Sequence, residues 1–432
     1  MSSTSASAGD GSIVEPGYSL ADSFRHLVRN LNPAGIGTGL VATLFSTMGP
    51  GMIVYTSAQQ GKLTDAQSVS WLFALYAFGG IATMITALHY RMPVVIAYSI
   101  PGAVLLGTVL PRVPLNEAVG AYMLVGLVTL ILTLTGAIKK VVENIPVPIM
   151  LGMVAGVLFS FGVSMFSAAV KVPQVYGVML VVFFGVMTFK SFSEKFPPIL
   201  VALAAGIILL GAFGQIKPIN LNWAIARPEF QVPSISLRAV LEISVPLFFL
   251  VIGVQNIQAV GVLLAEDYKP PINWMYLIPS IGAFINALMG AHCAVTAGPS
   301  TAICSSAAAH ERKDLRYIAA FFEGVFWFIF ALLAYIAVES VKMVPAEFTA
   351  VIAGLAMFEV FMSVFKGAYS GKFRAGAVVA MFIAVANLPI LNVGAPFWAI
   401  VFGVITSLLV ERDDFAFASN RKIAAPAPAG AK

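Results

Sequence analysis

The stretch Met92-Pro-Val-Val-Ile-Ala-Tyr-Ser-Ile-Pro-Gly-Ala-Val-Leu-Leu106 decides the fold class of this chain. Its first half is rich in β-branched residues, which favour an extended segment over a helix. Pro101 stands where a helix can begin, because the first helical turn does not need the missing N–H. The stretch therefore predicts an extended segment that leads into a short helix.

A second stretch repeats this pattern later in the chain. It reads Gly290-Ala-His-Cys-Ala-Val-Thr-Ala-Gly-Pro-Ser-Thr-Ala-Ile-Cys304, and Pro299 again stands where a helix can begin. Ser300 and Thr301 follow directly. We therefore expect a second short helix, which begins at a polar site.

The surroundings of both stretches are strongly apolar. Of the 432 residues, 59% are hydrophobic and 10% are charged, and the mean hydropathy is +0.91. Soluble domains carry about a quarter charged residues, so the bilayer must be the solvent of this chain. The net charge of +5 is scattered between apolar runs and indicates no nucleic-acid partner. Two cysteines and four histidines form no recognisable disulfide framework or metal motif, and we expect no metal and no cofactor.

Fourteen apolar segments alternate with short polar breaks, and most approach the ~20 residues that span a bilayer. They are 34–60, 66–88, 93–110, 117–137, 148–167, 174–189, 197–213, 237–265, 271–290, 295–309, 315–338, 346–364, 374–390 and 395–410. The ends, 1–33 and 413–432, are expected to be cytoplasmic tails. Within the first of them, residues 1–22 are rich in Ser, Ala and Gly, lack the apolar core of a signal peptide, and are expected to be disordered.

The distribution of Lys and Arg supports this count. With a cytoplasmic N-terminus, 18 of the 25 basic residues fall on the inner side and 7 on the outer side, as the positive-inside rule requires. The outer seven are Lys62, Arg112, Lys171, Lys217, Arg227, Arg238 and Lys342. An even number of spans with both termini inside follows.

The long polar break 215–236 divides the segments into two sets of seven. An odd number per half inverts the second half relative to the first, which is a known transporter architecture. The two short stretches are third in each half, so their helix N-termini would meet near the midplane and attract an anion. The alternative is a pair of proline-kinked helices that pack through small residues.

Several motifs resemble the benzoate/proton symporter (BenE-type) family. They are Tyr90-Arg-Met-Pro-Val, Tyr98-Ser-Ile-Pro-Gly-Ala-Val-Leu-Leu, Pro246-Leu-Phe, Gln255-Asn256, Gly261-Val, Tyr268-Lys-Pro-Pro, Gly290-Ala-His, Thr301-Ala-Ile-Cys and Ala395-Pro-Phe-Trp. The resemblance implies an all-α polytopic protein of the bacterial inner membrane, with fourteen spans in two inverted repeats. It also implies the fold of nucleobase, ascorbate and sulfate-type transporters.

The same resemblance implies two domains. A core (34–137 and 237–339) would carry the site and move against a gate (138–214 and 340–412), with 215–236 as an extracytoplasmic linker. Relatives of this kind are commonly homodimers held by their gate domains.

The expected substrate site surrounds the two helix starts. Tyr98, Ser99 and Gly102 flank the first, and Thr296, Gly298, Ser300 and Thr301 flank the second. We expect backbone N–H groups of Gly102, Ala103, Ser300 and Thr301 to hold a carboxylate, and Tyr98 to supply an aromatic wall or a hydroxyl donor. The alternative role of the small residues is helix packing.

Other polar residues lie inside apolar segments, where they need partners. Gln255 and Asn256 are expected to bond to substrate or to the extended segments, with a structural interhelical bond as the alternative. Glu323 is a candidate proton carrier or a structural hydrogen-bonding group. His292 is a candidate proton relay or a structural histidine. Glu359 ranks lower and could face a dimer interface.

Together these residues predict proton-coupled import of a small aromatic carboxylate. A different anion, a nucleobase-like heterocycle, or passive flow through a channel are the alternatives. An enzyme is not expected, because the sequence has no nucleophile–base pair, HExxH motif or phosphate loop. Glu242, four residues after Arg238, is expected to reach water or that arginine, without a role in transport.

Overall fold

A computed structural model of the chain describes residues 14–138, 146–189, 197–218, 224–387, 389–391 and 393–415. The expected inner-side residues Lys139, Lys140, Lys190, Lys195, Arg421, Lys422 and Lys432 lie outside these ranges. So do residues 1–13, part of the linker (219–223) and most of the C-terminal tail (416–432).

Each of the fourteen predicted segments contains a helix. Seven stretches within the described residues are long and apolar enough to cross a bilayer. They are α2–α3 (Pro33–Met48 and Pro50–Gln60), α4 (Asp65–Tyr90), α6 (Leu115–Leu134), α8 (Val147–Lys171), α12–α14 (Leu237–Ala265), the stretch Lys313–Leu332 with α17 (Tyr317–Leu332), and α19 (Ala346–Tyr369). The shorter helices are α5 (Ile100–Val109), α9 (Val178–Thr188), α11 (Pro198–Ala212), α15 (Ile272–Leu288), α16 (Gly298–Ser305), α18 (Ala334–Lys342), α20 (Arg374–Ala386) and α21 (Ala395–Val410).

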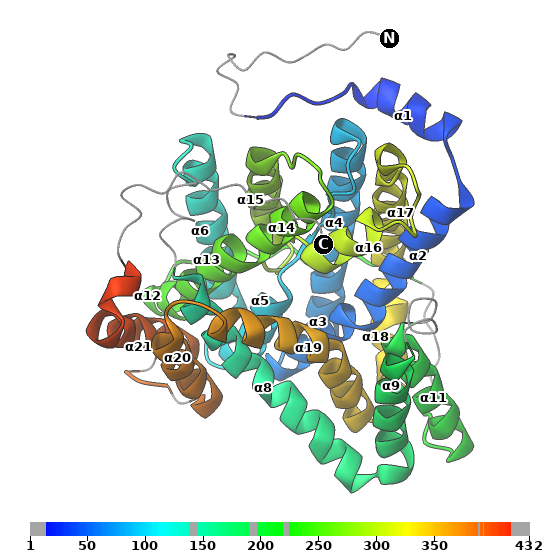
Figure 1. Cartoon of the computed structure of the whole chain (residues 1–432). Helices are drawn as coiled ribbons and strands as arrows, with labels where there is room; N and C mark the ends of the chain where they lie inside the picture. The colour runs from blue at the N-terminus through cyan, green and yellow to red at the C-terminus, as the bar shows by residue number, and fades with distance from the viewer. Residues whose placement is uncertain are drawn as a thin grey trace, which may run out of the picture.

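The helices pack as two groups that interleave the two halves of the sequence (Figure 1). In the core ranges, α4 packs on α17, α6 on α15, and α2 on α17. In the gate ranges, α8 packs on α19 and α20, and α9 packs on α11. In each of the pairs α4–α17 and α6–α15, the second segment of one half packs on the fourth segment of the other half. This reciprocal packing is consistent with an inverted repeat.

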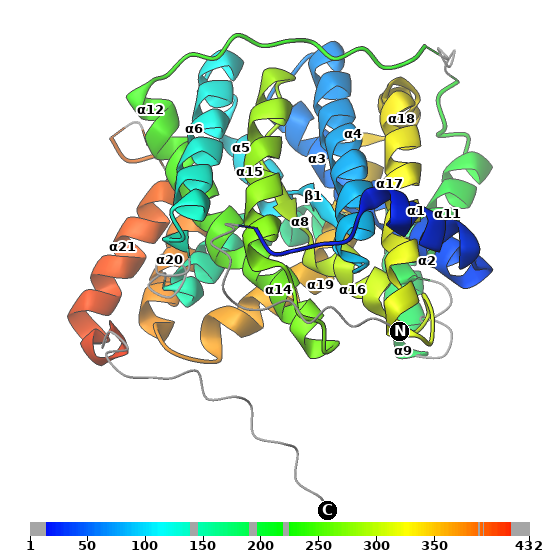
Figure 2. The same ribbon diagram turned by 90° about the horizontal axis from the view of Figure 1, so that it is seen from above.

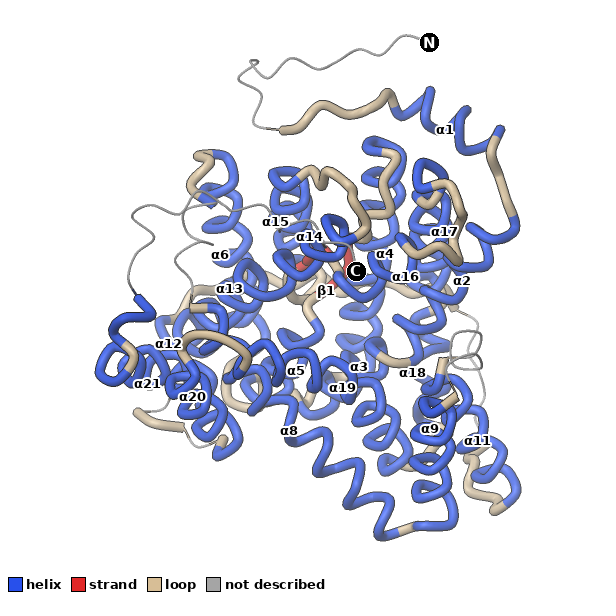
Figure 3. The backbone as a smooth tube through the Cα atoms, in the orientation of Figure 1, coloured by secondary structure: helices blue, strands red, loops and turns tan. Residues whose placement is uncertain are grey.

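The two decisive stretches form a pair of short strands. β1 (Ile96–Tyr98) runs antiparallel to β2 (Ala294–Thr296), with Ile96 opposite Thr296 and Tyr98 opposite Ala294. Both strands are fully buried, and Figure 3 shows them in the middle of the core helices. α5 and α16 begin two residues after their strands, with Pro101 and Pro299 in the first turn.

The described part of the linker is extended and lies across one end of the core helices (Figure 2). The Gln231 N–H donates to the Leu288 carbonyl at 2.8 Å, and the Ser234 N–H donates to the Asn116 carbonyl at 2.9 Å. These bonds fasten the linker to the ends of α15 and α6.

The N-terminal segment differs from the expected disordered tail. Residues 20–29 form the helix α1 (Leu20–Arg29), and Glu15 accepts a 2.9 Å hydrogen bond from the Asn273 N–H at the start of α15. Ser23 and Leu27 of α1 are buried. The amphipathic spacing of apolar residues in 20–29 could have indicated this helix.

Candidate functional site

The starts of α5 and α16 line one small pocket of about 20 Å³. A water molecule needs roughly 10–15 Å³, so the pocket has room for about one water. Its lining comes from α2, α3, both broken elements and α17. The lining residues are Phe45, Ser46, Pro50, Ala97, Tyr98, Ile100, Ala297, Pro299, Ser300 and Trp327.

Aromatic side chains form one wall of this pocket. The hydroxyls of Tyr98 and Tyr76 lie 2.6 Å apart, so one donates to the other, and both oxygens lie within hydrogen-bond distance of the Ser46 carbonyl, at 3.1 and 2.9 Å. The Trp327 indole N–H donates to Ser46 Oγ at 2.7 Å. The Ser46 carbonyl is available to the two tyrosines because Pro50, four residues later, has no N–H to donate to it. The sequence predicted Tyr98 here, but gave no local signal for Tyr76 or Trp327.

The backbone donors of the pocket differ from those expected. Gly102 N–H donates to its own N-cap, Ser99 Oγ, at 2.9 Å, and Ala103 N–H donates to the Ser99 carbonyl at 2.9 Å. Thr301 N–H donates to the Ala297 carbonyl at 3.1 Å. The expectation that these three N–H groups hold a carboxylate is corrected, because each already has an acceptor.

Two backbone N–H groups of the pocket remain available: that of Ser300, which was expected, and that of Ile100, which was not. Those of Ile100 and Ser300, one from each half of the chain, have no acceptor among the described residues. Both residues line the pocket, so each helix start presents one unused donor beside the positive end of its dipole. The Ser99 cap, which follows from Ser at an N-cap position, explains why the free donor shifts to Ile100.

Asn256 and Thr301 hold the strands in place. Asn256 Oδ1 accepts from the Thr296 N–H of β2 at 2.9 Å, as expected for a bond to the extended segment. Thr301 Oγ1 accepts from the Val95 N–H at 3.2 Å, and Thr296 Oγ1 donates to the Met275 carbonyl at 2.9 Å. These side chains support the site without lining the pocket.

Asn256 follows a π-helical stretch, residues 250–255, in the eighth segment. Such widened turns interrupt the regular hydrogen-bond ladder and are frequent at functional sites. Asn256 Nδ2 and the side-chain oxygen Oε1 of Gln255 are buried without a partner among the described residues. Gly298, at the start of α16, leaves room for Gln258, because a Cβ there would lie 2.8 Å from Gln258 Cγ.

We expect Asn256→Ala to lower the free energy of unfolding by about 1–3 kcal/mol, because the buried Thr296 N–H loses its acceptor. Substrate affinity should fall with it, since β2 ends at the pocket. Thermal unfolding and substrate-dependent stabilisation of the purified protein measure the two effects. Gln174→Ala, at an exposed amide, is the matched control; equal behaviour of the two variants would contradict the assignment.

Both ring nitrogens of His292 form hydrogen bonds. Its Nδ1 accepts from the Trp71 indole N–H at 2.9 Å, which places the ring proton on Nε2, and Nε2 donates to the Ser99 carbonyl at 2.7 Å. The ring therefore joins α4 to the N-cap of α5. This geometry favours the structural alternative over a proton relay.

Glu323 is buried in α17, and the Cys304 thiol of α16 donates to its Oε2 at 3.2 Å. Its other oxygen has no partner, and no ion pair to it occurs within the described ranges. A carboxylate without water or a cation beside it is costly to keep ionised. Glu323 thus contacts α16, the helix whose N-terminus lines the pocket, but does not line the pocket itself.

A larger vestibule of about 640 Å³ adjoins the pocket. Phe45 and Pro299 line both cavities. Glu359 is exposed and lines the vestibule with Gln258, Ser306 and Ser363, so it faces the space between core and gate, not an outer surface as the dimer-interface reading supposed. The vestibule lies on the side of the expected cytoplasmic loops.

On the opposite side, Glu242 is buried and paired with two arginines. Arg238 Nε donates to Oε1 at 2.8 Å, and Arg112 Nη2 lies 3.2 Å from Oε2. The expected contact with Arg238 is present, whereas the side chain does not reach water. Gly394 of the gate packs on this cluster, because a Cβ there would lie 3.0 Å from both Arg112 Nη2 and Glu242 Oε2.

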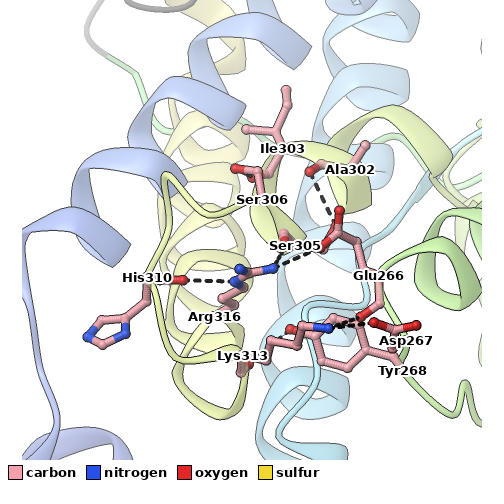
Figure 4. A network of polar contacts seen from close by, with 10 residues as sticks. All are labelled: Glu266, Asp267, Tyr268, Ala302, Ile303, Ser305, Ser306, His310, Lys313 and Arg316. Carbon is pink, nitrogen blue, oxygen red and sulfur yellow. Dashed lines mark hydrogen bonds and ion pairs between the residues drawn. The ribbon is translucent and has the colours of Figure 1, made fainter. Parts of the chain in front are cut away.

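A second polar network joins the ends of α14, α16 and α17 (Figure 4). Arg316 donates to the Ser305 and His310 carbonyls that follow α16, and pairs with Glu266 at 2.9 Å. Lys313 pairs with Asp267 at 2.8 Å and holds the pKa of that carboxyl below its usual range. Arg316 is buried and caps the C-terminal end of α16.

We expect Arg316→Leu to lower the free energy of unfolding by about 1–3 kcal/mol, because buried carbonyls lose a charged donor. Arg316→Lys should recover part of the loss, since one ammonium cannot reach the same set of acceptors as a guanidinium. Arg312→Leu is the control, because its pair with Asp314 is exposed and contributes little. Thermal unfolding in detergent measures all three; a destabilised Arg312→Leu with an unchanged Arg316→Leu would contradict the assignment.

No group of three or more His, Cys, Asp or Glu side chains that could hold a metal occurs in the described part of the chain. The site consists of backbone donors, aromatic rings, hydroxyls and a buried carboxyl. Such an arrangement can bind and release a small anion, and it offers no reactive nucleophile.

Two solved structures share this fold. The transmembrane domain of a cyanobacterial bicarbonate transporter, BicA, superposes with a TM-score of 0.53 at 16% identity, over 90% of this chain and 97% of that one. The murine anion transporter Slc26a9, in its inward-facing state, gives 0.55 at 13% identity, over 95% and 73%. The fold is that of polytopic membrane transporters.

The family follows from the sequence. Residues 29–409 match the family described as benzoate membrane transport protein (BenE), and the chain belongs to that family. The benzoate membrane transport protein of Acinetobacter baylyi is 29% identical over 86% of this chain and 94% of its own length. The inner membrane protein YdcO of Escherichia coli is 26% identical over 89% and 99%. The protein is a membrane transporter and not an enzyme.

Proposed function

We propose that the protein imports a small aromatic carboxylate, such as benzoate, together with a proton. The observation that carries this proposal is the pocket itself. It combines one free N–H donor from each broken element with an aromatic wall, and a buried carboxyl stands one helix behind it.

The two donors suit a carboxylate. The N–H groups of Ile100 and Ser300 lie at the positive ends of α5 and α16, so each would bond to one carboxylate oxygen. The rings of Tyr98 and Trp327 would contact the apolar part of the substrate. A cavity of about 20 Å³ is too small for a benzoate ring, so binding requires the pocket to widen.

The proposed motion is a displacement of the core against the gate. The pocket lies on the core face that meets the gate, and the vestibule would form the inner path from it. The cluster of Arg112, Glu242 and Gly394 would close the outer path. In this proposal, the pocket would connect to the cytoplasm through the vestibule while the outer path is closed.

The finer topology belongs to the same proposal. It comprises fourteen crossings, two inverted repeats, half-helices at α5 and α16, and both termini in the cytoplasm of a bacterial cell. Exposed apolar side chains on α8 and α19, among them Phe159, Phe166 and Met362, suit either lipid or the proposed homodimer through the gate.

Uptake of labelled benzoate into proteoliposomes, with and without an inward proton gradient, tests the function. Saturable uptake that rises with the gradient supports symport. Saturable uptake whose rate does not depend on the proton gradient rejects proton coupling. Uptake that does not saturate favours a channel. No benzoate uptake, together with thermal stabilisation by another small anion or a nucleobase, would retain the transporter and reject the substrate.

A further inference from the structure

The helix α1 is attached to the core on one side only. Ser23 and Leu27 are buried against the helices of the core, and His26 Nδ1 lies 2.9 Å from the Tyr317 hydroxyl of α17. Just before the helix, the Tyr18 N–H donates to the His89 carbonyl at 2.6 Å. These contacts fix the orientation of α1 relative to α4 and α17.

Next to this docked side, α1 exposes a row of large apolar side chains. Leu20, Phe24 and Val28 are 46%, 51% and 51% exposed, and Leu31 beyond the helix is also exposed. At 100° per residue these positions fall on one stripe. The polar residues Asp22, Arg25 and Arg29 lie on the opposite face, so α1 is strongly amphipathic.

The position of α1 in the fold identifies what covers this stripe. Only residues 30–32 separate α1 from Pro33, where the first bilayer-spanning stretch begins. α1 therefore lies within a few residues of the membrane boundary, and Figure 1 shows it lying across the ends of α4 and α17.

We propose that α1 lies in the membrane–water interface and binds the phospholipid surface. Leu20, Phe24 and Val28 insert between acyl chains, while Arg25 and Arg29 face the headgroup phosphates. Helices with one apolar and one basic face bind membranes in this way. Because α1 is fixed to α4 and α17, it ties the core to the membrane surface on the N-terminal side. This inference does not depend on the substrate.

Site-directed spin labelling of the full chain in phospholipid vesicles tests the proposal. Single cysteines at Phe24 and Val28 report the apolar stripe, and single cysteines at Asp22 and Arg25 are the matched controls on the opposite face. The native Cys293 and Cys304 are buried, and the parent protein carried through the same labelling is the blank. Collisions with oxygen, which partitions into acyl chains, are compared with collisions with a water-soluble nickel chelate.

We expect the oxygen-to-nickel ratio to be several-fold higher at positions 24 and 28 than at 22 and 25. Equal ratios at all four positions would place α1 in water and overturn the proposal. Labels at 24 and 28 that are shielded from both reagents would mean that protein covers the stripe, which also overturns it. A thermal unfolding curve for each labelled variant verifies that the fold is retained.

Discussion

In the Glu323→Gln protein, uptake driven by a proton gradient should fall to the level seen without a gradient. Gln has nearly the same shape and can still accept from Cys304, but it cannot exchange a proton. Glu323 Oε1 is buried without a hydrogen-bond partner, so the glutamine side chain can replace it without breaking an existing hydrogen bond. The measurement is accumulation of labelled substrate in proteoliposomes at a series of outside pH values.

Glu359→Gln is the matched control for this result. Glu359 is an exposed carboxylate in the vestibule, so its replacement should leave the dependence on the gradient in place. Thermal stabilisation by substrate shows whether Glu323→Gln still binds. Gradient-driven uptake that survives in Glu323→Gln would eliminate this residue as the proton carrier, while leaving the substrate site untested by that variant alone.

Gly394→Leu should abolish uptake. The backbone at Gly394 (φ −64°, ψ 152°) suits any residue, so the position requires glycine only for space. A leucine side chain would collide with Arg112 and Glu242. The gate could then not pack against the core at the outer side. We therefore expect the outward-open state to accumulate, with Gly394→Ala intermediate.

An impermeant thiol reagent added outside measures this shift through a cysteine at Ile100 in the pocket. The cysteine should react in the Gly394→Leu background and remain protected in the parent. Gly371→Leu is the control, because a Cβ at Gly371 meets no atom within 4 Å. Normal uptake in Gly394→Leu would show that this contact does not close the outer path.

The sequence was sufficient to locate the two helix starts. Prolines at 101 and 299, each preceded by a short β-branched run, carry strong local preferences that the structure retains. The pairing of the eighth segment with an extended stretch could also be anticipated, because the buried amide of Asn256 needed a partner. Local chemistry determined these features.

Features that depend on distant parts of the chain could not be predicted. Nothing near Tyr98 indicates that Tyr76 and Trp327 would also form hydrogen bonds with Ser46. Arg112 is 130 residues from Glu242 in sequence, and no local pattern connects them. Of the two free N–H groups, that of Ser300 was expected, whereas that of Ile100 was missed for a different reason. The Ser99 cap is visible in the sequence, and it transfers the free donor from Gly102 to Ile100.

The pairing of β1 with β2 also has a consequence for synthesis of the protein. Ile96 pairs with Thr296, which lies far along the chain. The first broken element therefore reaches the membrane long before the strand with which it pairs has left the ribosome. Until then its backbone groups lack the protein surroundings that extended chain requires inside a bilayer. A nascent chain that stops before β2 must therefore hold this segment outside the hydrocarbon or in contact with the insertion machinery. Assembly of the centre of the molecule is correspondingly a late, post-insertion event.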